Sequence, residues 1–150
     1  MCSAFVHLAR QRFDMPSSAR SSVRSPTEMA VSVIVFVEEV GRSLAFYERV
    51  VGAELDHFDE DGSYGELKSG VGFAAHRHVE RHLDLSFHRN EPDGLPSGFE
   101  LDFAVDDVDR AFGKAIDAGA TAVWEPREKP WGRSALVRDL DGVFVHLTQA

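Results

Sequence analysis

Two stretches of the sequence repeat one pattern: residues 37–43 read VEEVGRS, and residues 105–111 read VDDVDRA. In each stretch an apolar residue is followed by two acids, an apolar residue, a variable residue, an arginine and a small residue. A Gly-Ala pair then follows in both cases, at 52–53 and at 119–120. An internal repeat of this kind indicates that the chain holds two copies of one structural module.

The residues around the two stretches predict the same order of elements in both copies. The β-branched run VSVIVFV at 31–37 and the alternating FELDFAV at 99–105 each predict a strand. Apolar residues at helical spacing predict helices at 40–51 and 108–118. Shorter strands then follow at 54–58, 64–68 and 71–76, and at 121–124, 134–138 and 143–148. The sequence therefore predicts an α+β fold built from two βαβββ modules.

These elements set the expected boundaries of the folded part. We predict one domain over 29–150, with module one at 29–77, a linker at 78–97 and module two at 98–149. Residues 1–28 are rich in arginine and serine and poor in acids, which is typical of an organelle transit peptide. The same composition is explained by an unstructured leader or by a true start of the protein at Met29, and we prefer these two interpretations. We expect residues 1–28 to be flexible and to lie outside the fold.

The composition excludes several classes of protein. The 150 residues carry a net charge of −9, which disfavours binding to a nucleic acid backbone. No apolar run reaches the roughly 18 residues that a membrane-spanning helix needs. One cysteine, Cys2, cannot form a disulfide framework or a cysteine-rich metal centre. This cysteine usage favours a reducing compartment, and we expect a cytoplasmic protein.

With this repeat, the sequence resembles the vicinal oxygen chelate superfamily, the group of glyoxalases, bleomycin-resistance proteins and extradiol dioxygenases. The resemblance covers residues 29–149 and rests on the segments 37–47, 105–107, 118–120, 131–132 and 139–142. One departure is Leu140, where the usual turn has proline. The resemblance implies that the two sheets curl into half-barrels around a cavity, with the helices outside. It also implies a homodimer, in which modules pair within one chain or across two.

Strand alternation then sorts the side chains into two faces. We expect Leu101, Phe103 and Val105 to pack under the helix of module two. The cavity face would carry the alternate positions, namely Ser32, Ile34, Phe36, Gly72, Ala74, His76, Glu100, Asp102, Ala104, Phe144, His146 and Thr148. A shift of one residue in register would invert each of these assignments.

The resemblance also defines where a metal would bind. Metal-dependent relatives place ligands at positions that correspond here to Ser32, Ala74, Glu100 and His146. Alanine offers no donor atom and serine is a poor ligand for these metals, so Glu100 and His146 remain. His76, two residues after Ala74, would supply a third ligand. Without a metal, Glu100 and His146 would form a hydrogen-bonded pair or a general acid–base dyad.

Other candidate residues point to a small-molecule site. Phe36, Trp131 and Phe144 would form an aromatic pocket, in which Trp131 stacks on a planar ligand or packs against the sheet edge. Arg133 would pair with a ligand carboxylate, or with Asp102 or Glu100. Two inward carboxylates, Glu100 and Asp102, would bind a cation or an amine.

Three functions remain open from the sequence. The first is a small-molecule-binding protein without a complete metal site, which sequesters an aromatic or cationic ligand as antibiotic-resistance members of the superfamily do. The second is a divalent-metal-dependent lyase, isomerase or dioxygenase that uses Glu100, His146 and His76. The third is a scaffold whose dimer interface is its function. We expect a small-molecule ligand and a second copy of the chain as partners, no nucleic acid or membrane, and no cofactor unless a divalent metal binds.

Overall fold

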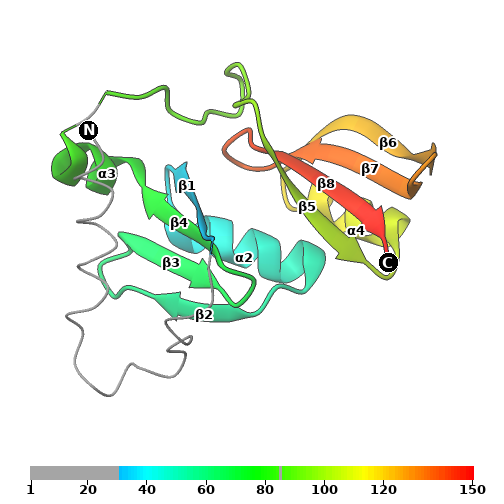
Figure 1. Ribbon diagram of the computed structural model, residues 1–150, viewed down its shortest axis with the longest axis horizontal. Helices are drawn as coiled ribbons and strands as arrows, with labels where there is room; N and C mark the ends of the chain where they lie inside the picture. Colours follow the sequence, from blue (N-terminus) through cyan, green and yellow to red (C-terminus); the bar gives the residue numbers. More distant parts are fainter. Residues whose placement is uncertain (1–30, 85) are drawn as a thin grey trace. The chain divides into compact units, whose positions relative to one another are not determined.

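The computed structural model describes residues 31–84 and 86–150 (Figure 1). The helices and strands of this part all lie in one compact unit over Ser32–Ala150. The predicted leader at 1–28 lies outside the described residues. None of the described helices is long and apolar enough to span a bilayer.

The first module forms a four-stranded mixed sheet. Its elements are β1 (Val33–Val37), α2 (Val40–Val51), β2 (Leu55–Phe58), β3 (Tyr64–Leu67) and β4 (Val71–Ala75). The strands are ordered β1-β4-β3-β2, with β1 and β4 parallel and the other pairs antiparallel. The short helix α3 (His76–Leu83) follows β4 directly.

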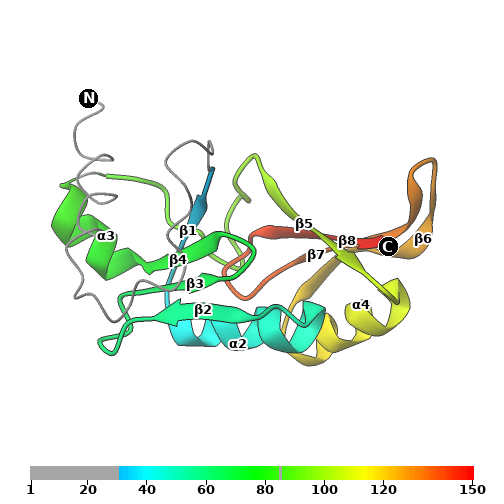
Figure 2. The same cartoon turned by 60° about the horizontal axis from the view of Figure 1, so that its bottom comes forward.

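The second module repeats this topology. Its elements are β5 (Glu100–Val105), α4 (Val108–Asp117), β6 (Thr121–Lys129), β7 (Gly132–Arg138) and β8 (Phe144–Gln149). The strands are ordered β5-β8-β7-β6, and β5 and β8 are the parallel pair. Figure 2 shows α2 on one side of the first sheet and α4 on one side of the second. The predicted α+β fold of two βαβββ modules is confirmed, and the described strands form two separate sheets without closing into a barrel.

The repeated acids of the sequence act as helix caps. The side chain of Glu39 accepts a hydrogen bond from the Arg42 amide at 3.1 Å, and Asp107 accepts one from the Arg110 amide at 2.9 Å. Each acid satisfies an amide that the first helical turn leaves without a partner. The second acid of the repeat therefore begins α2 and α4 at equivalent positions.

A buried core lies between each helix and its sheet. Alternate residues of β1 and β5 face the helices, and Val35, Val37, Leu101 and Val105 are buried there. Tyr47 of α2 is fully buried, with its ring centroid 5.2 Å from Phe73 of module one and 5.5 Å from Phe103 of module two. This tyrosine therefore joins the cores of the two modules.

The turn before β8 fastens module two to α2. Tyr47 donates a hydrogen bond from its hydroxyl to Asp139 at 2.6 Å. Asp141 accepts hydrogen bonds from the Glu38 amide at 2.9 Å and from the Ser43 hydroxyl at 3.3 Å. Both aspartates are almost fully buried. The DLDG segment at 139–142 is therefore a structural joint between the modules.

Two expected elements differ in the structure. The predicted strand at 71–76 ends at Ala75, and the predicted linker begins as the helix α3, because Val79 and Leu83 have the helical spacing needed to bury one face. The predicted strand at 121–124 continues to Lys129 as β6. Register shifts on either side of Trp124 interrupt the pairing with β7, and Pro126 lies in one of these irregular stretches, where a missing amide costs no ladder hydrogen bond.

Candidate functional site

One face of the second sheet carries a row of side chains from all four strands. Trp124 pairs with Leu136, Leu136 with His146, and His146 with Asp102. Directly paired residues point to the same side of a sheet, and this side is opposite to the one that packs on α4. We call it the open face. The alternation expected for β5 is confirmed, because Leu101 and Val105 are buried while Glu100 and Asp102 are exposed.

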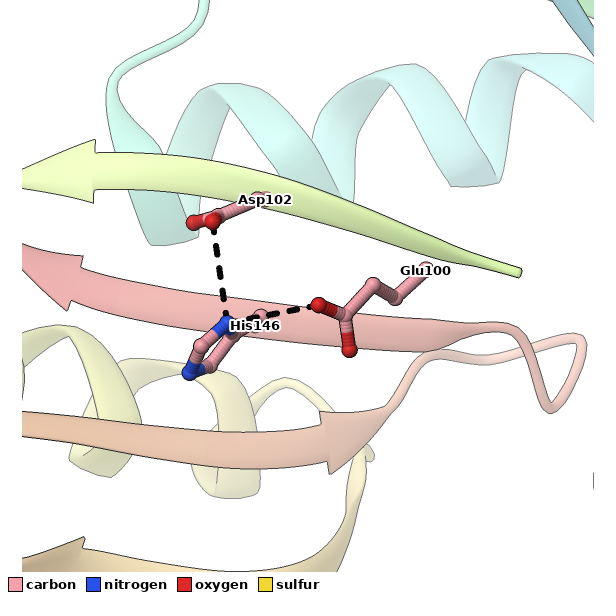
Figure 3. Close-up of side chains that lie close together, drawn as sticks. All are labelled: Glu100, Asp102 and His146. Carbon is pink, nitrogen blue, oxygen red and sulfur yellow. Dashed lines mark ion pairs between the residues drawn. The ribbon is translucent and has the colours of Figure 1, made fainter. Parts of the chain in front are cut away.

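Three titratable side chains gather on the open face. Figure 3 shows Glu100 and Asp102 on β5 and His146 on the neighbouring β8, with both carboxylates directed to the imidazole. The Nδ1 atom of His146 lies 3.5 Å from Oε1 of Glu100 and 3.6 Å from Oδ2 of Asp102. These distances are too long for strong hydrogen bonds, so the contacts are electrostatic. The Thr148 hydroxyl donates to Oδ1 of Asp102 at 2.7 Å and orients that carboxylate.

His146 is buried without a hydrogen-bond partner. Its side chain is 10% exposed, whereas those of Glu100 and Asp102 are 50% and 56% exposed. Neither ring nitrogen finds a partner among the described residues, and the same is true of the fully buried Ser134 hydroxyl. Buried polar atoms are usually satisfied, so these groups point to an interaction that the isolated chain does not supply.

Two tryptophan rings lie beside His146, and two cationic side chains lie close to those rings. The rings of Trp124 and Trp131 approach its imidazole edge-on, with centroids 5.5 and 6.4 Å away. The Arg127 guanidinium lies 4.7 Å from the Trp124 ring centroid, and the Lys129 ammonium lies 4.9 Å from that of Trp124 and 5.7 Å from that of Trp131. These are cation–π contacts, and within the described part of the chain neither cation also forms an ion pair with a carboxylate. Trp131 remains 59% exposed.

The cluster has the donor set of a divalent-cation site. One donor atom from each of Glu100, Asp102 and His146 can be chosen so that all lie within 4.8 Å of one another. Two carboxylates and one imidazole suit a first-row divalent metal, and a buried imidazole with free nitrogens is available as a ligand. The residues therefore fit such an ion.

Some predicted site residues lie elsewhere. His76 begins α3 and is buried in module one, with Nδ1 3.3 Å from Oε2 of Glu38 and the ring 5.9 Å from that of Phe87. It is therefore not part of the three-residue cluster, and Asp102 takes the third position expected for His76. The change from strand to helix at His76 is the physical reason, since the alternation that relates it to Ala74 stops at Ala75.

Arg133 faces the opposite side of the second sheet. It shares one face of β7 with the buried Ala135 and Val137, and its guanidinium donates two hydrogen bonds to Asp109 of α4 at 2.6 and 2.7 Å. It also contacts Glu128 at 3.2 Å. The expected pairing of Arg133 with Glu100 or Asp102 is therefore not formed, because β7 places its side chain on the helix side.

The remaining expected residues lie on the two sheets separately. Phe144 pairs with Glu100 across β8 and β5, next to the cluster. Ser32 is exposed just before β1, whereas Phe36 and Ala74 are paired with each other in the first sheet. The Phe36 ring packs on Phe87 with centroids 5.0 Å apart.

Sequence reasoning missed Trp124, Arg127 and Lys129. The expected strand stopped at Trp124, and Pro126 suggested a loop over the following residues. The available signal was that Arg127 and Lys129 are two residues apart and would share one face of a strand. It predicts their position only if the strand is expected to continue past Pro126 with a bulge.

Comparison with known proteins places this fold and repeat in a family. The family model described as the Glyoxalase/Bleomycin resistance protein/Dioxygenase superfamily matches residues 30–147. The chain is also similar to the protein described as putative glyoxylase CFP32 in Mycobacterium bovis and in Mycobacterium tuberculosis. The identity is 33% over 103 residues, which cover 68% of this chain and 36% of the mycobacterial protein. The chain thus spans about a third of the length of these relatives.

Solved structures share the architecture. A glyoxalase/bleomycin resistance protein/dioxygenase family enzyme from Burkholderia phytofirmans has a TM-score of 0.61 at 26% identity, over 77% of this chain and 94% of that one. The fosfomycin resistance protein FosX from Mesorhizobium loti has a TM-score of 0.57 at 19% identity, over 82% and 92% of the two chains, and this likeness concerns the fold alone. The repeat, the two matching sheets and the family model agree, and the chain belongs to the glyoxalase/bleomycin resistance protein/dioxygenase superfamily.

Proposed function

We propose that this protein binds a small molecule that carries a planar group and a positive charge, and that it does so on the open face of the second sheet. The observation that carries the proposal is the unsatisfied, buried His146 between two exposed carboxylates and two indole rings. A ligand there would meet a flat apolar surface and a negative charge at the same time.

Each part of the site would contribute a different interaction. Glu100 and Asp102 would attract the cationic group of the ligand, and Thr148 keeps the Asp102 carboxylate in place. Trp131, which is largely exposed, would stack on the planar group. Lys129 already lies near both indoles, so it would move aside or pair with an anionic substituent of the ligand. The imidazole of His146 would donate a hydrogen bond to the ligand from one of its ring nitrogens.

A second copy of the chain would complete the site. Glu100 and Asp102 are half exposed, and in the described unit the two sheets are separate. We propose a homodimer in which a first sheet, with Phe36 and Ala74 among its side chains, covers the open face of a second sheet. Sequestration of an aromatic or cationic compound, including an antibiotic, would follow from such an enclosed cavity.

A divalent-metal enzyme is the second candidate, and the three-residue cluster favours it. Glu100, Asp102 and His146 would hold the ion, and the metal would supply a Lewis acid that polarises a substrate oxygen. Thr148 would orient Asp102, and the indoles of Trp124 and Trp131 would limit the access of water to His146. A lyase, isomerase or dioxygenase would use this arrangement.

One set of measurements separates the two candidates. Tag-free protein purified without chelator is analysed for metals, and its thermal unfolding is followed with the planar cation proflavine. The binding proposal expects no metal that depends on His146, so that the metal content is the same in His146→Ala, and a rise in Tm that grows with proflavine concentration. The Glu100→Gln/Asp102→Asn variant should lose this rise, whereas Asp117→Asn, an exposed acid on α4, should keep it.

The opposite results decide against the proposal. Stoichiometric metal that disappears in His146→Ala would establish the metal site instead. Protein without metal and without a proflavine-dependent shift, or with a shift that survives Glu100→Gln/Asp102→Asn, would contradict ligand binding at this face.

A further inference from the structure

A second group of metal-ligating side chains lies on module one, apart from the open face. Helix α3, which follows β4 in Figure 1, has the sequence HRHVERHL, so His78 and His82 occupy positions i and i+4 in it. Side chains four residues apart project from the same side of a helix on consecutive turns. The two imidazole centroids are 4.4 Å apart, with an angle of 43° between the ring planes.

This pair is free to bind a ligand. His78 is half-buried and His82 is exposed, and the described residues offer neither ring a hydrogen-bond partner. Val79 and Leu83, on the buried side of α3, anchor the helix in module one. The backbone under the two histidines is therefore held in place by packing that does not involve them.

Charges of both signs lie near His78, since Asp61 and Asp59 are negative and Arg81 is positive. Burial, and then the neighbouring His82, lower the pKa of His78, while Asp61 and Asp59 act in the opposite direction. The same two aspartates, on the segment between β2 and β3, place negative charge near the histidines.

We propose that His78 and His82 form a two-histidine binding site for a divalent transition metal, with Cu²⁺ bound more tightly than Ni²⁺ or Zn²⁺. Two histidines at this spacing on one helix face are a recurrent metal-binding arrangement. Imidazole nitrogens suit these ions, and the order of affinities follows the general trend for first-row metals. Water would complete the coordination shell, and Asp61 would contribute charge. The site does not depend on the proposed function of the open face.

A bound metal would join two consecutive turns of α3. The helix is only 8 residues long, and isolated helices of this length are marginal. Because α3 continues directly from β4 and contacts both β4 and β1, metal binding would stabilise this end of module one. Stabilisation by a ligand that binds only the folded state grows with its concentration.

The test uses tag-free full-length protein carrying Cys2→Ser, Glu100→Ala and His146→Ala, so that neither the thiol nor the open-face cluster can react with the metal. Titration with CuCl₂, followed by calorimetry and by thermal unfolding, should show one ion per chain and a rise in Tm. His78→Gln or His82→Gln should each weaken binding about 100-fold. Only one imidazole then holds the ion, and the gain in affinity from a second imidazole held nearby on the same helix is lost. His88→Gln, which changes an exposed histidine outside α3, is the matched control and should bind as the parent does.

Two results would overturn this proposal. One is binding that is unchanged in both His78→Gln and His82→Gln. The other is a parent protein that binds Cu²⁺ no more tightly than the His78→Gln/His82→Gln double variant. Because the tested protein lacks the Glu100 and His146 side chains, neither result bears on the binding of a small molecule at the open face.

Discussion

At Asp139, burial and hydrogen bonding act on one carboxyl group in opposite directions. Burial raises the pKa, while the Tyr47 hydroxyl and the amides of Val143 and Asp141 lower it, and burial outweighs them. The folded protein therefore binds this proton more readily than the unfolded chain does. Through this group, the free energy of unfolding falls as the pH rises through the raised pKa.

Replacing Asp139 should remove this pH dependence. In Asp139→Asn the side chain does not titrate, so the stability of the wild type relative to the variant should increase as the pH is lowered from neutral through the raised pKa, towards the usual aspartate value of about 4. Urea unfolding at several pH values measures the difference.

Asp109 provides the control for this measurement. Its hydrogen bonds from Arg133 hold its pKa below the usual range, so it stays ionised between pH 5 and 7 in both states. The difference between wild type and Asp109→Asn should therefore be flat over this interval, and should fall rather than rise as the pH is lowered further towards about 4. A stability of the wild type relative to Asp139→Asn that does not rise as the pH is lowered to about 4 would contradict the raised pKa.

At the scale of elements, the turn between β7 and β8 has a strict steric requirement. Gly142 has a φ of 83°, and a Cβ atom there would lie 2.3 Å from the carbonyl oxygen of Glu91. The segment around Glu91 is itself held by Arg138, which donates hydrogen bonds to the carbonyls of Glu91 and Gly94. Any side chain at position 142 therefore strains the turn and pushes the linker away.

Gly142→Ala should lower the free energy of unfolding by about 2 kcal/mol or more, because the unfavourable φ and the backbone clash add. Gly113, in the middle of α4, has open space around its Cβ position. Gly113→Ala should instead stabilise the protein by up to about 1 kcal/mol through helix propensity. Urea denaturation of both variants tests this contrast, and a Gly142→Ala variant as stable as Gly113→Ala would refute it.

At the scale of the whole unit, the two modules are coupled through buried polar contacts. Asp141 of module two accepts hydrogen bonds from Glu38 and Ser43 of module one and lies 3.4 Å from the Arg42 guanidinium. Its removal would leave the Glu38 amide and the Ser43 hydroxyl without these bonds. A buried polar group that loses its partner costs about 1–3 kcal/mol.

Asp141→Ala should therefore weaken the coupling between the modules. Both tryptophans of the chain, Trp124 and Trp131, lie in module two, so tryptophan fluorescence reports on that module alone. Far-UV circular dichroism reports on both. In the wild type the two urea transitions should coincide, and in Asp141→Ala the fluorescence and dichroism midpoints should separate. Coinciding midpoints in the variant, at an unchanged stability, would show that Asp141 does not join the modules.

The candidate site could be predicted from the sequence only in part. Strand alternation placed Glu100, Asp102 and His146 on one face, because a period of two is a local property of an extended chain. His76 was assigned to the wrong element, since the choice between strand and helix after Ala75 depends on where Val79 and Leu83 can be buried. Trp124 and Lys129 were missed because the contact of Trp124 with His146, and that of Lys129 with Trp124, depend on a bulged strand that pairs across the sheet.

The amino-acid sequence by itself determined the repeat, the strand and helix order of both modules, and the acids that begin α2 and α4. These features depend on residues close together in the chain, where periodicity and capping act directly. Only the tertiary structure decided that Asp139 and Asp141 join the modules, that Arg133 faces α4, and that His146 lies unsatisfied beneath two indoles. Each of these depends on side chains that are distant in sequence, and their positions are set by how the strands pair and how the helices pack.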